Sequence, residues 1–273
     1  METAVSSKST AELCLYVQSR VPVRLYVPLA LFLSAAACAG GLPEDASRFA
    51  VAALTAYTLV FQFRHDLADL ARDRAQHPER VLVRAPLLAA FRALCATLFP
   101  ANVALIAAAS GSGARVAILV ALNAIVAAWY SQRAALGLRA LPAAHVLLLK
   151  YPAFVFLVSP PGGEWLPLAL AMTLVYLCFG IHEIAHDESL RPAGPALAGE
   201  IGALCAVVAA MVLWSAPHAV RPVLGALALG TAAVLVRLFQ EYSVGLNPAG
   251  RWRYAAFLVS APVVVAFAWR NLA

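Results

Sequence analysis

Charge is scarce in this sequence. Asp, Glu, Lys and Arg make up 12% of the 273 residues and hydrophobic residues make up 63%, and the mean hydropathy is +0.80. Soluble domains carry about 25% charged residues, so the composition excludes a soluble protein, and the length leaves no room for a separate soluble domain. It predicts a polytopic membrane protein of the all-α class.

Cysteine is sparse too. The chain has five, without a Cys-x-x-Cys pair, and most lie in apolar runs, which is typical of small buried residues rather than metal ligands or disulfides. A cleavable signal is also missing, because residues 1–20 contain acids and no short apolar core precedes a small-residue cleavage site. We expect these residues to form a cytoplasmic N-terminal segment.

Aromatic residues are not interleaved with basic ones, although the net charge is +6. The basic residues are instead spread among the loops, as membrane topology requires. We therefore expect the lipid bilayer, and not nucleic acid, as the surroundings of this chain. No pattern indicates an obligatory protein partner.

Long apolar runs dominate what is present. At about 20 residues per crossing, the length allows about nine transmembrane helices in one domain that covers residues 1–273. Gly-Leu-Pro at 41–43 and Gly-Ser-Gly at 111–113 are examples of the breakers between them. The predicted spans are residues 22–41, 47–65, 85–109, 113–131, 141–160, 166–186, 195–215, 218–240 and 253–271.

The basic residues also predict an orientation. If residues 61–84 are cytoplasmic, the loops on that side hold most of the 20 Lys and Arg residues, and the loops on the other side hold almost none. This distribution satisfies the positive-inside rule. It predicts a multi-pass protein of the cell's inner membrane, with its N-terminus and residues 61–84 on the cytoplasmic side.

Residues 61–84, FQFRHDLADLARDRAQHPERVLVR, form the most charged stretch. Asp66, Asp69 and Asp73 lie within about 60° of one another around a helix. Pro78 predicts that this helix stops near His77, because the residue before a proline avoids helical geometry. Carboxylates bind Mg²⁺, the metal binds phosphate oxygens, and arginines neutralise the remaining phosphate charge. The stretch therefore favours a magnesium and phosphate site over a solvated, salt-bridged helix.

A second acidic cluster stands at the inner end of the sixth predicted span. Glu183 and Asp187 are four residues apart and share one face of a helix. On the predicted topology both clusters reach the same side of the membrane. They could therefore clamp a shared group between them.

These motifs resemble those of the UbiA-type intramembrane prenyltransferases. That family's Asn-Asp-x-x-Asp-x-x-x-Asp run corresponds to 65–73 here, with His65 in place of the Asn. Its Asn-Pro-x-Arg-Pro-Leu loop corresponds to residues 77–82, where the Pro-x-Arg-x-Leu core is kept. Its second signature, Asp-x-x-x-Asp, corresponds to Glu183 with Asp187, without a third acid. Tyr130-Ser131 and the basic residues after it resemble the family's loop between spans 4 and 5.

The resemblance implies a helical bundle around a lipid-open central cavity, with the acidic motifs at its cytoplasmic end. Such enzymes use Mg²⁺ to hold an isoprenyl diphosphate, which ionises to an allylic cation that alkylates a lipophilic aromatic or isoprenoid acceptor. A diphosphate leaving group needs charge neutralisation, and a dry chamber protects the cation from water. The implied function is Mg²⁺-dependent prenyl transfer within the membrane.

Site residues follow from the same resemblance. Asp66, Asp69 and Asp187 are the expected catalytic residues, and the metal set is Asp66, Asp69, Asp73, Glu183 and Asp187. The expected diphosphate contacts are Arg80, Lys150, Tyr130 and Arg139. An ammonium at Lys150, about nine residues into the fifth span, is costly against lipid and is expected to face the cavity. Snorkelling, or pairing with Glu200, is the alternative.

Three other functions stay open. A terpene cyclase of the same fold captures the allylic cation with its own alkene and needs no acceptor. His182 to His186 reads His-Glu-x-x-His, which is typical of a zinc metalloprotease with Glu183 as general base, although this leaves the three aspartates without a role. A non-catalytic protein that binds or transports lipid is the third.

Overall fold

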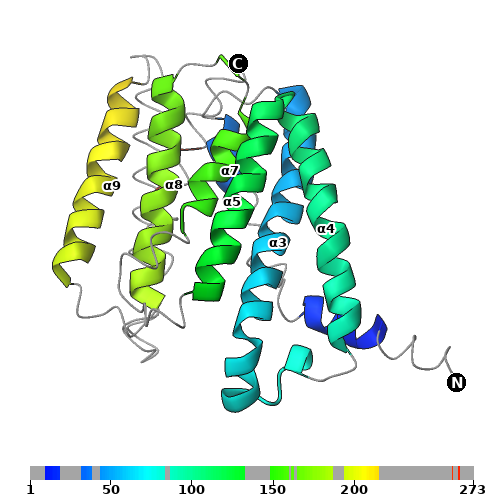
Figure 1. Ribbon diagram of the computed structural model, residues 1–273. Coiled ribbons are helices and arrows are strands. Elements are labelled where there is room, and N and C mark those ends of the chain that lie inside the picture. The colour runs from blue at the N-terminus through cyan, green and yellow to red at the C-terminus, as the bar shows by residue number, and fades with distance from the viewer. Residues whose placement is uncertain are drawn as a thin grey trace, which may run out of the picture.

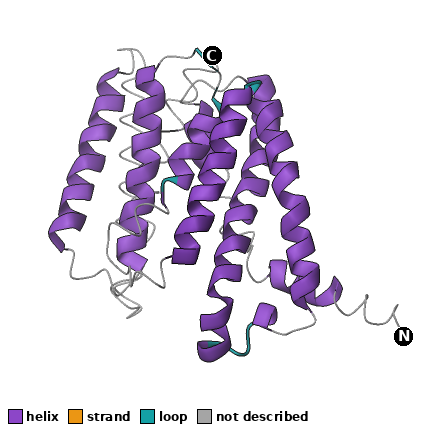
Figure 2. Ribbon diagram, viewed as in Figure 1, coloured by secondary structure: helices purple, strands orange, loops and turns teal. Residues whose placement is uncertain are grey.

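The computed structural model describes residues 10–18, 32–38, 44–83, 87–132, 148–159, 161–162, 165–186 and 194–214, with Ser260 and Val264. Every regular element in these ranges is a helix (Figures 1 and 2), which confirms the all-α class for this part of the chain. Apart from Ser260 and Val264, the spans predicted at 218–240 and 253–271 lie outside the described residues. The total of about nine stays a prediction.

Four of the helices follow the predicted spans closely, whereas the helices at 44–76 and 150–158 differ in length from the spans predicted at 47–65 and 141–160. The boundaries predicted at 85–109, 113–131, 166–186 and 195–215 are confirmed to within two residues. The elements are α3 (Glu44–Gln76), the short 3₁₀ helix η1 (Val81–Val83), α4 (Leu87–Ser110), α5 (Gly113–Gln132), α7 (Lys150–Val158), α8 (Trp165–His186) and α9 (Gly194–Trp214).

The end of α3 lies where Pro78 predicts it. The helix ends at Gln76, and the backbone N–H of His77 makes a last helical bond to the carbonyl of Asp73 at 2.7 Å. The N–H of Arg80 then donates to the carbonyl of His77 at 3.1 Å, closing a tight turn. The turn reverses the chain, so that the loop and η1 lie beside the last turns of α3 (Figure 1).

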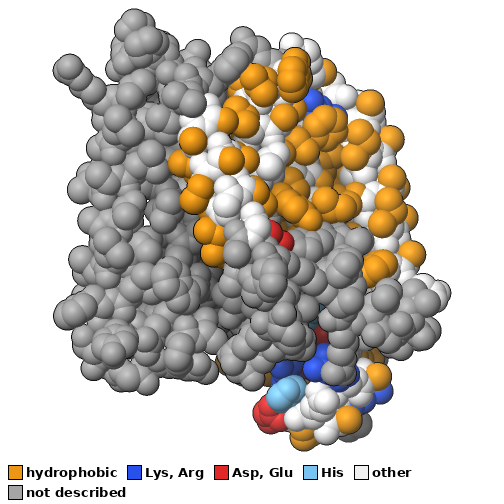
Figure 3. Space-filling view, turned by 90° about the vertical axis from the view of Figure 1, so that its left-hand side faces the viewer, with side chains coloured by type: hydrophobic (Ala, Val, Ile, Leu, Met, Phe, Trp, Pro, Cys, Tyr) orange, Lys and Arg blue, Asp and Glu red, His pale blue; other side chains and the backbone are white. Residues whose placement is uncertain are grey.

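Three helices are long and apolar enough to cross a membrane. Within the described residues they are Leu88–Ser110 in α4, Gly113–Gln132 in α5 and Trp165–His182 in α8. Large apolar side chains such as Ile125, 58% exposed, point outward from them, which suits contact with lipid tails. Figure 3 shows hydrophobic side chains over the described helices and charged ones gathered at the lower end. The chain is therefore a membrane protein.

Ring contacts fix the direction of α7 relative to α3. Near its start, Lys150 approaches the Phe61 ring, and one turn later Phe154 contacts the Tyr57 ring, with centroids 5.4 Å apart. Residue numbers thus rise along α7 as they fall along α3, so the two helices are antiparallel. A hydrogen bond of 2.5 Å from the Tyr57 hydroxyl to the Lys150 carbonyl joins them.

Two apolar clusters hold these helices together. The larger one fills the bundle and includes Phe61, Leu119 and Phe154, each no more than 1% exposed. The smaller one lies where α3, α4, η1 and residues 10–18 meet, and we call it the end cluster. It comprises Tyr16, Phe63, Leu70, Leu82 and Phe91.

The antiparallel order of α3, α4 and α5 predicts which side each turn faces. Q76C and S112C, made singly in a chain whose five native cysteines are replaced, should react with a membrane-impermeant maleimide from opposite sides of the membrane. On the predicted topology Q76C reacts in inverted vesicles and S112C in right-side-out vesicles. Labelling of both from one side would contradict the arrangement.

Candidate functional site

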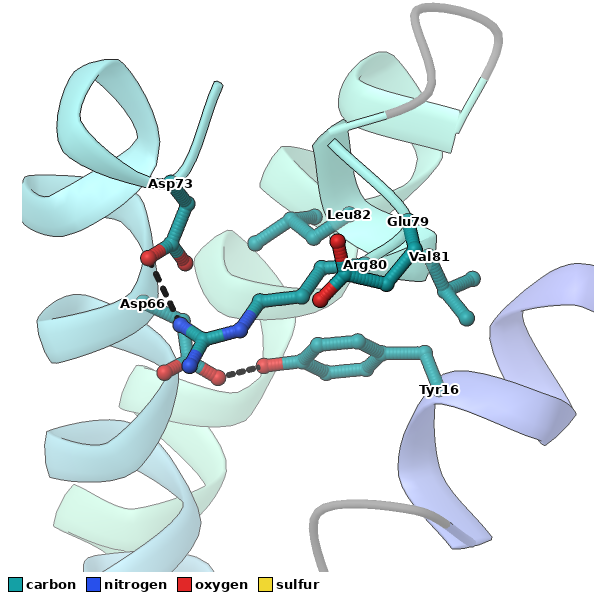
Figure 4. Close-up of a pocket in the computed structure, with 7 residues that line it drawn as sticks. All are labelled: Tyr16, Asp66, Asp73, Glu79, Arg80, Val81 and Leu82. Carbon is teal, nitrogen blue, oxygen red and sulfur yellow. Dashed lines mark hydrogen bonds and ion pairs between the residues drawn. The ribbon is translucent and has the colours of Figure 1, made fainter. Parts of the chain in front are cut away.

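The turn after α3 encloses a cavity of about 260 Å³ at the charged end of the bundle. Tyr16 and Arg80 reach toward α3 from two different segments, and the aspartates of α3 face them (Figure 4). The cavity thus joins three parts of the sequence. Its lining residues are Tyr16, Asp66, Asp73, Glu79, Arg80, Val81 and Leu82.

Asp66 is the most deeply buried acid of this site, with 2% of its surface exposed. Gln62, one turn earlier on α3, donates to Oδ1 of Asp66 at 3.1 Å. The hydroxyl of Tyr16 donates to Oδ2, and His65 Nδ1 lies 3.5 Å from Oδ1. Because a buried carboxylate is costly without donors, these contacts explain how Asp66 is kept in an apolar setting.

Asp73 forms an ion pair with Arg80, which lies in the turn after α3. Nη1 of Arg80 donates to Oδ1 of Asp73 at 2.6 Å, and the side chains are 37% and 10% exposed respectively. Pairing stabilises the buried carboxylate, while the exposed part of the guanidinium stays accessible from the cavity. Arg80 is thus placed to meet an anion that enters there.

Asp69 lies beside the cavity rather than in its lining. Its Oδ2 is 3.4 Å from Nε2 of His65, and its side chain is 14% exposed. The three aspartates share one face as predicted, but the rise of the helix separates Asp66 from Asp73 by about 10.5 Å along the axis. The backbones of these two residues are thus about two helical turns apart.

The donor set nevertheless fits magnesium. Among the described residues no three His, Cys, Asp or Glu side chains converge on one metal position. Mg²⁺ does not require this, since it usually binds to one or two carboxylates and completes its shell with water and substrate phosphates. An all-oxygen row with Arg80 beside it suits such a metal and phosphate assembly.

Lys150 and Tyr130 both face other helices. The Lys150 ammonium lies 6.0 Å from the centroid of the Phe61 ring and 5.0 Å from that of Tyr151. Lys150 is not among the residues that line the cavity beside Arg80, and its expected contact with a diphosphate stays a prediction. Tyr130, on α5, is buried and its ring lies 5.5 Å from that of His65, so it stands next to the aspartate row.

The second acidic cluster is described in part. Tyr151 stacks on Phe179 of α8 with ring centroids 3.4 Å apart, so α8, which follows α7 after a short loop, runs in the same direction as α3. Counting 1.5 Å per residue, Glu183 lies about 6 Å beyond Phe179, and Asp66 lies about 7.5 Å beyond Phe61. The backbone of Glu183 thus lies toward the same end of the bundle as Asp66. The Glu183 side chain, Asp187 and Arg139 lie outside what the structure describes.

The sequence did not reveal every contributor to this site. Tyr16 lies in a segment read only for a signal peptide, and its contact with Asp66 is purely tertiary. Nothing in the sequence distinguishes Arg64 from the other arginines of the charged stretch. In the structure its Nη1 donates to the Asn123 carbonyl at 2.5 Å, which links α3 to α5. The contact of Gln62 with Asp66 could have been predicted from the sequence, since residues four apart on a helix are neighbours.

The Arg80 and Asp73 pair predicts a measurable coupling. R80Q and D73N should each lower the thermal unfolding temperature in detergent, and the double variant should lose little more than either one. We expect a coupling of about 0.5–1 kcal/mol, because the guanidinium is partly exposed. Fully additive losses would show that the two side chains do not interact.

Comparison of the chain with protein-family models, curated proteins and solved structures finds no match. The likeness to the UbiA-type enzymes therefore rests on the motif residues themselves and stays a prediction.

Proposed function

We propose that the protein is a UbiA-type prenyltransferase, which moves an isoprenyl group from an isoprenyl diphosphate to a lipophilic acceptor inside the membrane. One observation carries this proposal. Two buried carboxylates of α3, Asp66 and Asp73, and the guanidinium of Arg80 line one cavity at the end of an apolar helical bundle. Such a site binds a charged head group while its tail stays in hydrocarbon.

Asp66, Asp69 and Asp73 would hold Mg²⁺, and the metal would bind the diphosphate. The metal, when bound, neutralises the charge that builds up on the leaving diphosphate. Arg80 is already aimed at the cavity by the turn at Pro78, and it exchanges part of its pairing with Asp73 for the phosphate oxygens. Glu183 and Asp187 are the proposed second set of acids, and the direction of α8 supports this for Glu183.

The reaction breaks the bond between the allylic carbon and the diphosphate oxygen, and the electron pair leaves with the diphosphate. A nucleophilic carbon of the acceptor then bonds to the allylic cation and loses a proton. Because water would capture this cation, the reaction needs a dry chamber. The buried rings of Tyr57, Phe61 and Phe154, from α3 and α7, provide apolar surroundings about two turns from Asp66.

Loss of one carboxylate should abolish turnover without unfolding the bundle. We expect D66N and D69N to lower the release of diphosphate from a prenyl diphosphate, in Mg²⁺ and detergent, by at least about 100-fold. D45N is the matched control, because Asp45 lies on the same helix about 31 Å away. Wild-type rates in both D66N and D69N would refute the assignment.

The products separate this function from its alternatives. Diphosphate release that depends on an added aromatic or isoprenoid acceptor, and that stops with EDTA, is the expected result. Acceptor-independent release with a cyclic hydrocarbon product would instead identify a terpene cyclase. Bound zinc without diphosphate release would favour a protease built on His182 and His186, and binding of prenyl lipid without turnover would favour a non-catalytic carrier.

A further inference from the structure

The segment of residues 10–18 reaches the acidic site although it lies far from it in the sequence. Tyr16 is 50 residues from Asp66, and its hydroxyl donates to Oδ2 of that carboxylate. Figure 4 shows the Tyr16 ring extending from this segment across the cavity toward α3, on the same side as Arg80. This segment therefore contributes Tyr16 to the wall of the cavity.

The ring of Tyr16 is anchored independently of its hydroxyl. Its centroid lies 5.6 Å from that of Phe63 on α3 and 4.7 Å from that of Phe91 on α4. Phe63 and Phe91 also contact each other, with centroids 5.0 Å apart. Such aromatic pairs stabilise packing beyond the area they bury. The ring contacts thus hold the segment of residues 10–18 against α3 and α4, and the hydroxyl donates its hydrogen bond to Asp66.

Tyr16 and Gln62 donate to different oxygens of Asp66. Tyr16 bonds to Oδ2, and Gln62 bonds to Oδ1. An ionised carboxylate offers about four acceptor positions. Donors on both of its oxygens fix the plane of the carboxylate. A preset orientation favours metal binding, because ligating carboxylates depend on the hydrogen bonds that orient them.

We propose that Tyr16 is a positioning residue, which orients Asp66 for a divalent cation, and that residues 10–18 complete the metal and diphosphate site. This inference rests on the proposed function. It adds to the site the ring and the hydroxyl of Tyr16, a residue that lies outside the acidic motifs.

The test measures metal binding directly. Mn²⁺ titration of purified protein in detergent, with free Mn²⁺ followed by electron paramagnetic resonance, gives the affinity with and without inorganic pyrophosphate. Y16F keeps the ring and removes the hydroxyl, so we expect Mn²⁺ to bind about 10-fold to 100-fold more weakly. The metal-free unfolding temperature should change no more than it does in the control variant.

Y57F is that control. Tyr57 is a buried tyrosine on the same helix whose hydroxyl also donates a hydrogen bond, to the Lys150 carbonyl, about 13.5 Å along the axis from Asp66. Its Mn²⁺ affinity should equal that of the wild type. Equal Mn²⁺ affinity in Y16F and wild type would overturn the role of Tyr16 and leave the proposed function standing. A wild-type protein that binds no Mn²⁺, with or without pyrophosphate, would overturn both.

Discussion

A carboxylate that is almost shielded from water must be surrounded by donors, and Asp66 imposes this constraint on one end of the molecule. Gln62 supplies one donor from the same helix, and Tyr16 supplies the other from the N-terminal segment. The end cluster holds Tyr16 in place, and the turn at Pro78 brings Arg80 to the neighbouring Asp73. The polar site around Asp66 and Asp73 is therefore built from three separate parts of the chain.

The buried interior of the described bundle is largely apolar away from this end. Aromatic rings of α3 and α7 pack against each other in the interior. The helices α4, α5 and α8 are apolar enough for their outward faces to contact lipid tails. A ligand with a diphosphate head and a hydrocarbon tail matches both regions at once. When a bound ligand excludes water from the site, metal and guanidinium charges act more strongly on it. The site and the membrane thus support the same kind of chemistry.

Hydropathy, helical periodicity and helix-breaking residues predicted the helices well. They could not predict contacts between segments that are distant in the sequence. Pro78 placed the end of α3, the glycine at 111, with a φ of +62°, marked the turn before α5, and hydropathy gave the long helices. The shared face of the aspartates followed from helical periodicity. The contact of Tyr16 with Asp66 and the clamp from Arg64 to Asn123 depend on tertiary packing. No spacing along one helix reveals them.

The central claim is that a metal and diphosphate bind between the acids of α3 and the inner end of α8. Crystals soaked in Mn²⁺ and pyrophosphate, with anomalous difference maps at the manganese edge, test it most directly. The account predicts Mn²⁺ peaks about 2.1–2.2 Å from carboxylate oxygens of the aspartate row, with pyrophosphate between them and Arg80. Metal bound only between His182 and His186, or no metal at the aspartates, would contradict it.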